Sequence, residues 1–287
     1  MSAEIAHRVI DLGEVRLQVA EAGPEDGPLV LLLHGFPETG RSWRHQVGPL
    51  AAAGLRVVVP DQRGYGQSSK PEGIRAYGLD TLVDDVARLI KACGRERAHL
   101  VGHDWGGLVA WWAASTRPDL VERLAILNAP HPAVAGSYAR RHLTQALRSG
   151  YVGFFQLPAV PERLLALGDY ALLRRSLTST SRPGAFSEAD LAAYTDAWAE
   201  PGALTAMLNW YRALMRVPRA EPADPRIKAP TLVLWGVKDV ALERGLATAS
   251  ADLCEQADLR FFEEATHWIH REEVEPVNAA LIGVLRP

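Results

Sequence analysis

Residues 102–107, Gly-His-Asp-Trp-Gly-Gly, place one acidic side chain between glycines. They follow an apolar run and precede residues 108–115, which have helical character. Small residues two positions before and two positions after Asp104 are typical of the sharp strand-to-helix turn called a nucleophile elbow, because larger side chains would clash there. Serine usually stands at the centre of this turn. An aspartate there predicts a carboxylate that attacks carbon by displacement and forms an ester, which water must then cleave.

A second interpretation of Asp104 is structural. An aspartate in front of a helix often accepts hydrogen bonds from the first backbone amides of that helix. The spacing of the glycines does not decide between such an N-cap and a nucleophile. A nucleophilic carboxylate also needs a separate base that activates water, and enzymes with this turn carry the three groups in the order nucleophile, acid, histidine.

Asp239 and His267 satisfy this order. They follow the short apolar runs 231–235 and 259–262, so both are expected at the sheet edge that carries the nucleophile. Taken alone, Asp239 would be interpreted as a turn residue and His267 as a surface histidine. Their expected position at one edge of the sheet favours a catalytic pair instead. His270 is the nearest competitor. It lies one helical turn further on and is expected to belong to the next helix, so we assign the base to His267.

The motif His-Gly-Phe-Pro at 34–37 follows another apolar run and reaches the same edge. In such enzymes a backbone amide from this loop and the amide after the nucleophile form an oxyanion hole. The expected donors are therefore the amides of Phe36 and Trp105. Gly35 would allow close backbone approach, and Pro37 would fix the turn, for which a cis bond is one solution.

The elements that position these residues alternate between short apolar runs and helical segments. The first two expected strands flank Gly13-Glu14 and should form a hairpin, and residues 79–92 have the apolar spacing of a helix. This alternation predicts the α/β class, with a mostly parallel, twisted sheet covered by helices on both faces. Strands are expected over 8–12, 16–21, 29–33, 56–60, 98–101, 123–127, 231–235 and 259–262.

The middle of the chain differs from both ends. Residues 133–222 contain no run typical of a buried strand, are rich in Ala, Leu and Arg, and are broken by prolines, which predicts several short helices. The simplest arrangement is a helical cap inserted over the carboxyl edge of the sheet, where sites of open α/β sheets lie. We therefore expect a core of residues 1–132 and 223–287 with a cap of residues 133–222, and the proline-rich stretch 218–230 as the return linker.

Composition narrows the classes of function. The chain has 287 residues, of which 48% are hydrophobic and 23% charged, which suits one large globular domain with an insertion. Its 31 Lys and Arg against 34 Asp and Glu give a net charge of −3, and no basic run favours nucleic acid or a membrane surface. Two cysteines, Cys93 and Cys254, make no disulfide framework. We find neither a signal peptide nor a membrane span, so the expectation is a cytoplasmic protein.

With these residues in place, the chain resembles an α/β-hydrolase of the epoxide hydrolase family over nearly its whole length. The resemblance implies a small-molecule epoxide as substrate, no metal and no organic cofactor, and a monomer or homodimer. It also implies the α/β-hydrolase fold. The matching motifs are residues 34–37, Asp61-x-Arg63-Gly64-x-Gly66-x-Ser68, residues 102–107 and His267-Trp268. The first two of these motifs are widespread among α/β hydrolases, and the Asp-Trp pair of the third is shared with haloalkane dehalogenases.

The family uses two cap tyrosines to hydrogen-bond and protonate the epoxide oxygen. The resemblance assigns these roles to Tyr151, which precedes Phe155-Gln156 in a Tyr-x-x-x-Phe-Gln pattern, and to Tyr211 in the motif Asn-Trp-Tyr-Arg at 209–212. Tyr138, Tyr170 and Tyr194 lie outside such patterns. Two departures stand out: Thr266 replaces a glycine common among relatives, and Gly150 precedes the first cap tyrosine. The expected substrate pocket includes His34, Pro37, Trp210 and Trp268.

The reaction expected from these residues is conversion of an epoxide and water to a vicinal diol through an ester on Asp104. A haloalkane dehalogenase with the same nucleophile is the main alternative. It would need two hydrogen-bond donors to the leaving halide. One of them usually comes from the residue after the His-Gly pair, and here that residue is Phe36, whose side chain has no donor. The indole N–H groups of Trp105 and of tryptophans in the cap remain available. A fluoroacetate-type dehalogenase would have arginine after the nucleophile, where this chain has Trp105. A non-catalytic binding protein on the same scaffold is the third alternative.

Overall fold

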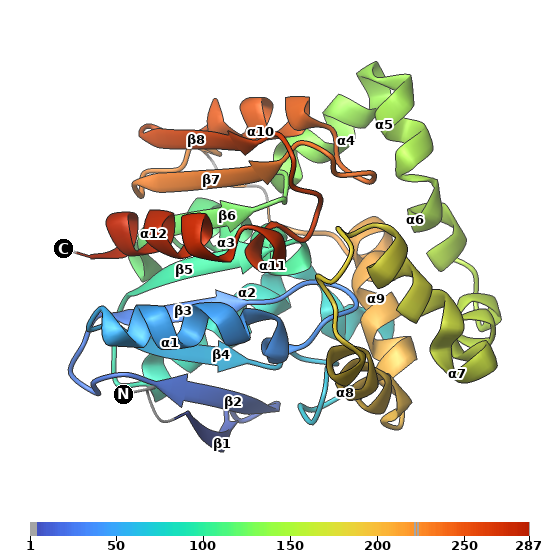
Figure 1. The fold of residues 1–287 in the computed structure, drawn as a ribbon, viewed down its shortest axis with the longest axis horizontal. Coiled ribbons are helices and arrows are strands. Elements are labelled where there is room, and N and C mark those ends of the chain that lie inside the picture. The colour runs from blue at the N-terminus through green and yellow to red at the C-terminus, as the bar shows by residue number, and fades with distance from the viewer. Residues whose placement is uncertain (1–4, 221, 223, 287) are drawn as a thin grey trace.

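The computed structural model describes residues 5–220, 222 and 224–286. Its centre is an eight-stranded sheet in the order β1-β2-β4-β3-β5-β6-β7-β8 (Figure 1). Strand β2 is antiparallel to both neighbours, and β3 to β8 are parallel to one another, which confirms the predicted mostly parallel sheet. The strands are β1 (Ala6–Asp11), β2 (Arg16–Ala22), β3 (Leu29–Leu33), β4 (Arg56–Pro60), β5 (Ala98–His103), β6 (Val121–Leu127), β7 (Thr231–Gly236) and β8 (Ala257–Phe262).

Helices cover both faces of this sheet, as predicted (Figure 1). On one face lie α1 (Arg44–Ala52), α11 (Ile269–Glu272) and α12 (Val274–Leu285). On the other face lie α2 (Leu79–Ala92), α3 (Trp105–Thr116) and α10 (Arg244–Ala251). Short 3₁₀ helices interrupt the connections at η1 (Gly40–Trp43), η2 (Ile74–Tyr77) and η3 (Pro118–Leu120).

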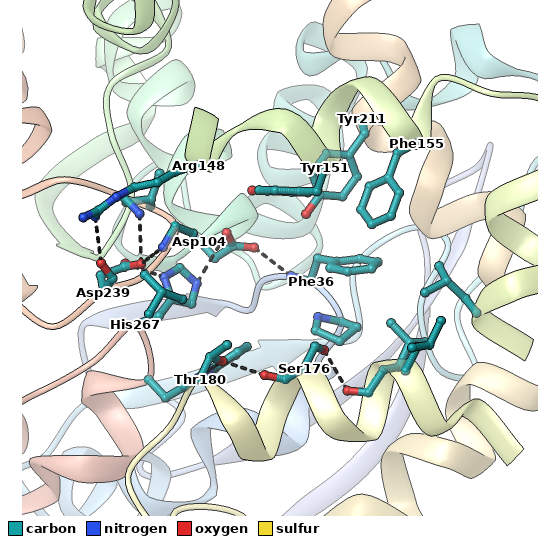
Figure 2. Close-up of a pocket in the computed structure, with 18 residues that line it drawn as sticks. Phe36, Asp104, Arg148, Tyr151, Phe155, Ser176, Thr180, Tyr211, Asp239 and His267 are labelled. Atoms are coloured by element: carbon teal, nitrogen blue, oxygen red, sulfur yellow. Dashed lines mark hydrogen bonds and ion pairs between the residues drawn. The ribbon is translucent and has the colours of Figure 1, made fainter. Parts of the chain in front are cut away.

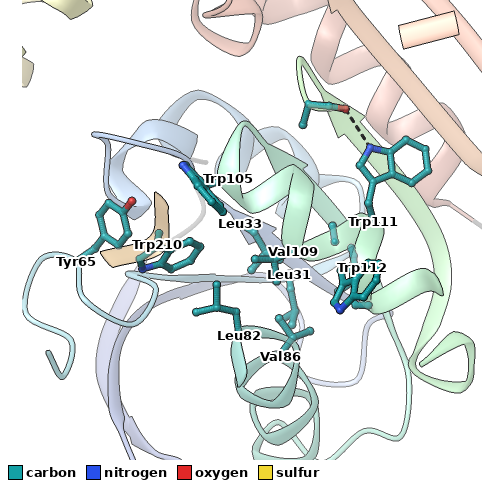
Figure 3. Close-up of a cluster of buried hydrophobic side chains, with 14 of the residues drawn as sticks. Leu31, Leu33, Tyr65, Leu82, Val86, Trp105, Val109, Trp111, Trp112 and Trp210 are labelled. Carbon is teal, nitrogen blue, oxygen red and sulfur yellow. Dashed lines mark hydrogen bonds between the residues drawn. The ribbon is translucent and has the colours of Figure 1, made fainter. Parts of the chain in front are cut away.

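Strand β3 shows why a continuous apolar run folds as a central strand. Its five residues are all buried. Leu29, Leu31 and Leu33 belong to the core under α2 and α3, whereas Val30 and Leu32 belong to the core under α1 and α12. Because alternate side chains of a strand point to opposite faces, only an apolar residue at every position satisfies both cores. Figure 3 shows part of the first core, where Leu31 and Leu33 lie near Val109 of α3.

In the described residues between β6 and β7 lie six helices, at the end of the molecule toward which the parallel strands point (Figure 1). In the described part of this interval no strand occurs, and Ile227 alone makes an isolated bridge. Helix α7 contains a non-helical stretch at 167–170, which divides it into two segments. We propose that this helical block is the cap. Its helices are α4 (Pro132–Arg141), α5 (Leu143–Arg148), α6 (Gly150–Phe155), α7 (Val160–Ser179), α8 (Glu188–Ala199) and α9 (Ala203–Arg216).

The helical block is fastened to the sheet domain by buried polar contacts of α8. The hydroxyl of Tyr194 donates to Glu38 Oε1 at 2.9 Å. The indole of Trp198 donates to the carbonyl oxygen of Pro37 at 2.6 Å. These partners belong to the loop after β3, which also carries the predicted oxyanion-hole residue. The described helices include none that is long and apolar enough to cross a membrane.

Strand ends are where the sequence predictions were least accurate. The hairpin is confirmed, but β1 covers Ala6–Asp11 and not 8–12, because residue 12 turns away and its amide donates to the carbonyl oxygen of Val15 at 2.9 Å. Strand β5 extends past the predicted end at 101 to His103, which pairs with Leu127 of β6. The ladder therefore continues into the turn that carries Asp104.

Candidate active site

Asp104 stands at the turn between β5 and α3 in a backbone conformation that residues with side chains rarely adopt, with φ 50° and ψ −121°. Its carboxylate makes no capping bond to α3, so the N-cap interpretation fails. Instead Oδ1 accepts a hydrogen bond from the amide of Phe36 at 2.8 Å. A Cβ at Gly106 would lie 2.1 Å from the carbonyl oxygen of Leu33, so the turn packs too closely against β3 for any larger residue.

Asp239 and His267 meet Asp104 at the same edge of the sheet (Figure 2). Nδ1 of His267 lies 2.7 Å from Oδ2 of Asp239, and Nε2 lies 3.6 Å from Oδ2 of Asp104. The Asp239 side chain is fully buried, while those of His267 and Asp104 keep 10% and 16% of their surface exposed. The imidazole therefore bridges two carboxylates, one sealed in the protein and one open to a cavity.

Asp239 is held by neighbours that the sequence reasoning missed. The side-chain amide of Asn128 donates to its Oδ2 at 2.8 Å, and the backbone amides of Ala241 and Leu242 donate to Oδ1 at 2.8 and 2.9 Å. Burial raises the pKa of Asp239, but the charge of His267 and these hydrogen bonds outweigh it, so the pKa is lowered. Asn128 directly follows β6, and this position at the carboxyl edge is the signal that could have identified it.

Tyr151 of α6 and Tyr211 of α9 face Asp104 from the opposite side of the cavity, and both hydroxyls point toward its carboxylate (Figure 2). Their ring centroids are 5.9 Å apart. Burial raises both pKa values, and the negative charge of Asp104 raises them further. Both phenols therefore stay protonated. The patterns around them contact each other, because the side-chain amide of Gln156 donates to the carbonyl oxygen of Tyr211 at 2.9 Å.

We call Asp104, Asp239 and His267 the triad. The cavity between the two tyrosines and this triad has a volume of about 330 Å³. Its walls are mostly apolar side chains from α6, α7 and the loop after β7. Two of the four residues predicted for the pocket, Pro37 and Trp268, line it. The lining residues beyond the triad, the two tyrosines and these two are Phe36, Arg148, Phe155, Leu165, Leu172, Leu173, Ser176, Thr180, Val240, Ala241 and Leu242.

The chain is similar to known proteins in sequence and in fold. The family model of the alpha/beta hydrolase fold matches residues 28–274. AB hydrolase superfamily protein YfhM of Bacillus subtilis (strain 168) is 45% identical over 96% of each chain. Epoxide hydrolase 4 of Homo sapiens is 36% identical over 97% of this chain and 78% of its own. The chain belongs to the epoxide hydrolase family. The crystal structure of Epoxide Hydrolase A from Mycobacterium thermoresistibile superposes with a TM-score of 0.86 at 33% identity, covering 99% of this chain and 98% of that chain.

Two predicted pocket residues of this epoxide hydrolase family member lie elsewhere. The ring of His34 is fully buried and binds the neighbouring loop after β4, since Nε2 accepts a hydrogen bond from the amide of Gln62 at 3.0 Å. The indole of Trp210 is buried between Tyr65 and Trp105 and donates to the carbonyl oxygen of Arg63 at 3.1 Å (Figure 3). Because consecutive helix residues point in different directions, Trp210 faces the core while its neighbour Tyr211 faces the cavity.

The predicted oxyanion donors lie beside the nucleophile. The amide of Phe36 already binds Asp104, and a Cβ at Gly35 would lie 2.4 Å from the Cβ of Asp104. Trp105 is the first residue of α3, so its amide has no partner within the helix. The peptide bond between Phe36 and Pro37 is cis.

The two departures from the family pattern have local explanations. The amide and hydroxyl of Thr266 both donate to the carboxylate of Glu272 at 2.7 Å, which anchors the turn in front of His267. Gly150 is the first residue of α6, where a Cβ would meet no atom within 4 Å. Neither departure displaces a predicted catalytic group.

A buried cluster lies behind His267. Nε2 of His103 bonds to the carbonyl oxygen of His267 at 2.9 Å, and Nε2 of His270 lies 3.4 Å from Oε2 of Glu38. His270 therefore faces this cluster and not the cavity. Donor atoms of Glu38, His103 and His270 lie within 4.8 Å of one another, as metal ligands would. The guanidinium of Arg271, however, donates to Glu38 at 2.8 Å and places a positive charge where a cation would bind.

The protonation of His267 depends on both carboxylates. Burial lowers its pKa, but the charges of Asp239 and Asp104 and the hydrogen bond to Asp239 outweigh burial and raise the pKa to about 10. The ring is therefore charged while Asp104 is free. Because the folded pKa lies above the ordinary value of 6.5, this interaction stabilises the fold fully below about pH 6.5 and is lost as the pH rises through about 10.

Removal of the Asp104 charge should lower the pKa of His267. In Asp104→Ala, the imidazole loses one of its two acidic partners, so its titration midpoint is expected well below the value of about 10 in the unchanged protein. Nuclear magnetic resonance of the imidazole protons across the pH range measures both midpoints, and Asp252→Ala provides a control at an exposed aspartate. Equal midpoints in the two variants would contradict the coupling.

Proposed function

We propose that this chain is an epoxide hydrolase that converts an epoxide and water into a vicinal diol. The observation that carries the proposal is the pair of protonated phenols of Tyr151 and Tyr211, which face the Asp104 carboxylate across an apolar cavity. Opening of an epoxide leaves an alkoxide, a poor leaving group that needs a proton at the moment the carbon–oxygen bond breaks. A nucleophile on one side and proton donors on the other meet this need.

In the first half of the proposed reaction, an oxygen of Asp104 attacks an epoxide carbon. The bond between this carbon and the ring oxygen breaks, and the oxygen takes a proton from Tyr151 or Tyr211. The phenolate regains its proton from His267. The pKa of His267 falls at this stage, because the ester at Asp104 no longer carries the negative charge that raised it. The enzyme now holds a hydroxyalkyl ester and a neutral imidazole.

In the second half, neutral His267 removes a proton from water, and the hydroxide attacks the carbonyl carbon of the ester. The amides of Phe36 and Trp105 stabilise the resulting oxyanion. The bond between this carbon and the alkoxy oxygen breaks, and His267 gives its proton to the departing diol. The carboxylic acid at Asp104 then returns its proton to His267, which restores the charged pair.

Halide chemistry fits the cavity less well. A haloalkane dehalogenase would direct indole N–H groups at the leaving halide. Among the lining residues in the described part of the chain, Trp268 alone carries an indole, and its N–H donates to Oγ1 of Thr180 at 2.9 Å. The indole of Trp105 lies outside the lining, edge-on to Tyr211 at 4.9 Å between ring centroids.

The proposal is tested with racemic styrene oxide and a set of haloalkanes. We expect the purified protein to form phenylethanediol, measured by chromatography, and to release no halide above the rate without enzyme. Halide release without diol formation would favour the dehalogenase. Binding of epoxides without any product, measured by calorimetry, would favour the non-catalytic protein.

The tyrosines should contribute as proton donors. Tyr151→Phe and Tyr211→Phe are each expected to lower kcat/KM for styrene oxide about tenfold to a hundredfold, and the double variant by more than about 10³-fold, because one donor partly replaces the other. Tyr138→Phe, whose ring stacks on His142 outside the cavity, is the matched control. Full activity of the double variant would show that the phenols take no part.

A further inference from the structure

Arg148 is the one lysine or arginine among the cavity-lining residues that the structure describes. It ends α5, and its Nη1 donates to the backbone carbonyl oxygen of Asp239 at 3.1 Å (Figure 2). Within the described residues it forms no ion pair with a carboxylate. From this unpaired cation we propose that the natural substrate is an epoxide that also carries a carboxylate, and that Arg148 binds this carboxylate. The inference rests on the proposed epoxide hydrolase function.

The guanidinium has capacity for such a ligand. Arginine carries five N–H donors in a planar fork, and the contact with Asp239 uses one of them. A carboxylate can accept two parallel hydrogen bonds from this fork, which gives both attraction and orientation. The mechanism proposed above has no step for Arg148, so its charge is free for recognition.

The place of Arg148 on the cavity wall suits the charged end of an amphiphilic molecule. Val240, next to the residue that Arg148 contacts, and Leu172 of α7 both line the cavity and keep 56% and 52% of their surface exposed, so they mark its mouth. The inner wall is apolar, with Leu165, Leu173 and Phe155 buried. A ligand with its carboxylate at the mouth and its apolar part inside would bury few polar groups without partners.

A wholly apolar epoxide would complement this wall less well. It would cover part of the guanidinium of Arg148 without offering an acceptor, which costs free energy because a charged donor loses water. The cavity volume of about 330 Å³ lies at the low end of the range for ligand pockets. We therefore infer a compact acid, with an aromatic ring or a short chain between carboxylate and epoxide.

Arg148 could instead serve only to position Asp239 through its carbonyl oxygen. The two roles differ in what they do to substrates. A positioning role lowers turnover of every epoxide alike, because the triad is shared by all of them. A carboxylate-binding role changes KM for acids and leaves neutral epoxides nearly unaffected.

The experiment compares para-oxiranylbenzoate with its neutral isostere para-oxiranylbenzamide, together with short epoxy acids of increasing chain length and their amides. For the best pair we expect kcat/KM of the acid to exceed that of the amide about tenfold at low salt, mainly through KM. The advantage should shrink as ionic strength rises, because salt screens a pair at the cavity mouth. Absence of a preference for the acid in every pair would overturn the inference.

Variants separate the two roles of Arg148. Arg148→Gln should remove the preference for the acid, so that the ratio of kcat/KM for acid and amide falls to about one, and Arg148→Lys should retain part of the preference because it keeps the charge but not the fork. Arg141→Gln, an exposed cap arginine outside the cavity lining, is the control and should leave the preference unchanged. Equal losses for acid and amide in Arg148→Gln would assign a positioning role and refute carboxylate binding. If the unchanged protein hydrolysed neither the acid nor the amide of any pair, the proposed function itself would be refuted.

Discussion

Replacement of His267 by glutamine is expected to stop the reaction halfway, with the substrate covalently bound to Asp104. The imidazole lies 3.6 Å from the nucleophile and 2.7 Å from Asp239, which is the geometry of a base for water. Attack on the epoxide needs the carboxylate and the two tyrosines, which this variant retains. Steady-state diol formation should fall about 10²- to 10⁴-fold, the usual contribution of a positioned general base.

Mass spectrometry of the intact protein provides the decisive measurement for His267→Gln. After incubation with styrene oxide, the protein mass should rise by that of one substrate molecule, and peptide mapping should place the addition on Asp104. His142→Gln changes an exposed histidine of the cap and should turn over normally without an adduct. If His267→Gln formed diol at the normal rate, the base would have to be another residue.

Asp104→Ala should abolish both the adduct and the diol. The nucleophile is the one group that the proposed mechanism cannot replace, so kcat/KM is expected to fall by at least about 10⁴-fold. The variant should still fold, because the Asp104 carboxylate makes a single hydrogen bond, to the amide of Phe36, and an ion contact with His267. Circular dichroism and the melting temperature check this point.

The Asp104→Ala result also distinguishes covalent catalysis from direct attack by water. In direct attack, His267 would activate water against the epoxide, and the loss of Asp104 would leave substantial diol formation. Asp252→Ala serves as the control, since this aspartate is exposed at the end of α10. Appreciable turnover by Asp104→Ala at neutral pH would exclude the ester mechanism.

Sequence patterns predicted the sheet well where a single physical demand decides the residue type. Residues 29–33 and 79–92 were predicted with the bounds that the structure has, because a doubly buried strand and an amphipathic helix each require their own apolar spacing. Asp239 and His267 could be paired with the elbow residue because parallel strands bring their carboxyl ends to one edge of a sheet.

Contacts between distant segments were beyond such reasoning. Arg148 reaches Asp239 across 91 residues, and nothing in its immediate neighbours in the sequence specifies that meeting. Asn128 reaches Asp239 across 111 residues, and its place at the end of β6 predicts the sheet edge but not the partner. Conversely, His34 and Trp210 lie close to pocket residues in the sequence, but their side chains are buried and bind backbone groups of the loop after β4. Whether a side chain faces a cavity or a core depends on which neighbouring element packs against it.

The buried contacts of α8 bear on how the molecule unfolds. Arg271 joins Tyr194 and Glu38 in a network with no exposed side chain, and Asp190 of the same helix accepts from Arg44 at 2.7 Å. Lifting α8 away would break the buried hydrogen bonds of Tyr194 and Trp198 and separate Asp190 from Arg44, at a cost of about 0.5–1.5 kcal/mol for each hydrogen bond. The cap and the sheet domain should therefore melt in one cooperative transition. We therefore expect the motion that opens the cavity to substrate to occur in α5, α6 and α7, the helices around its mouth.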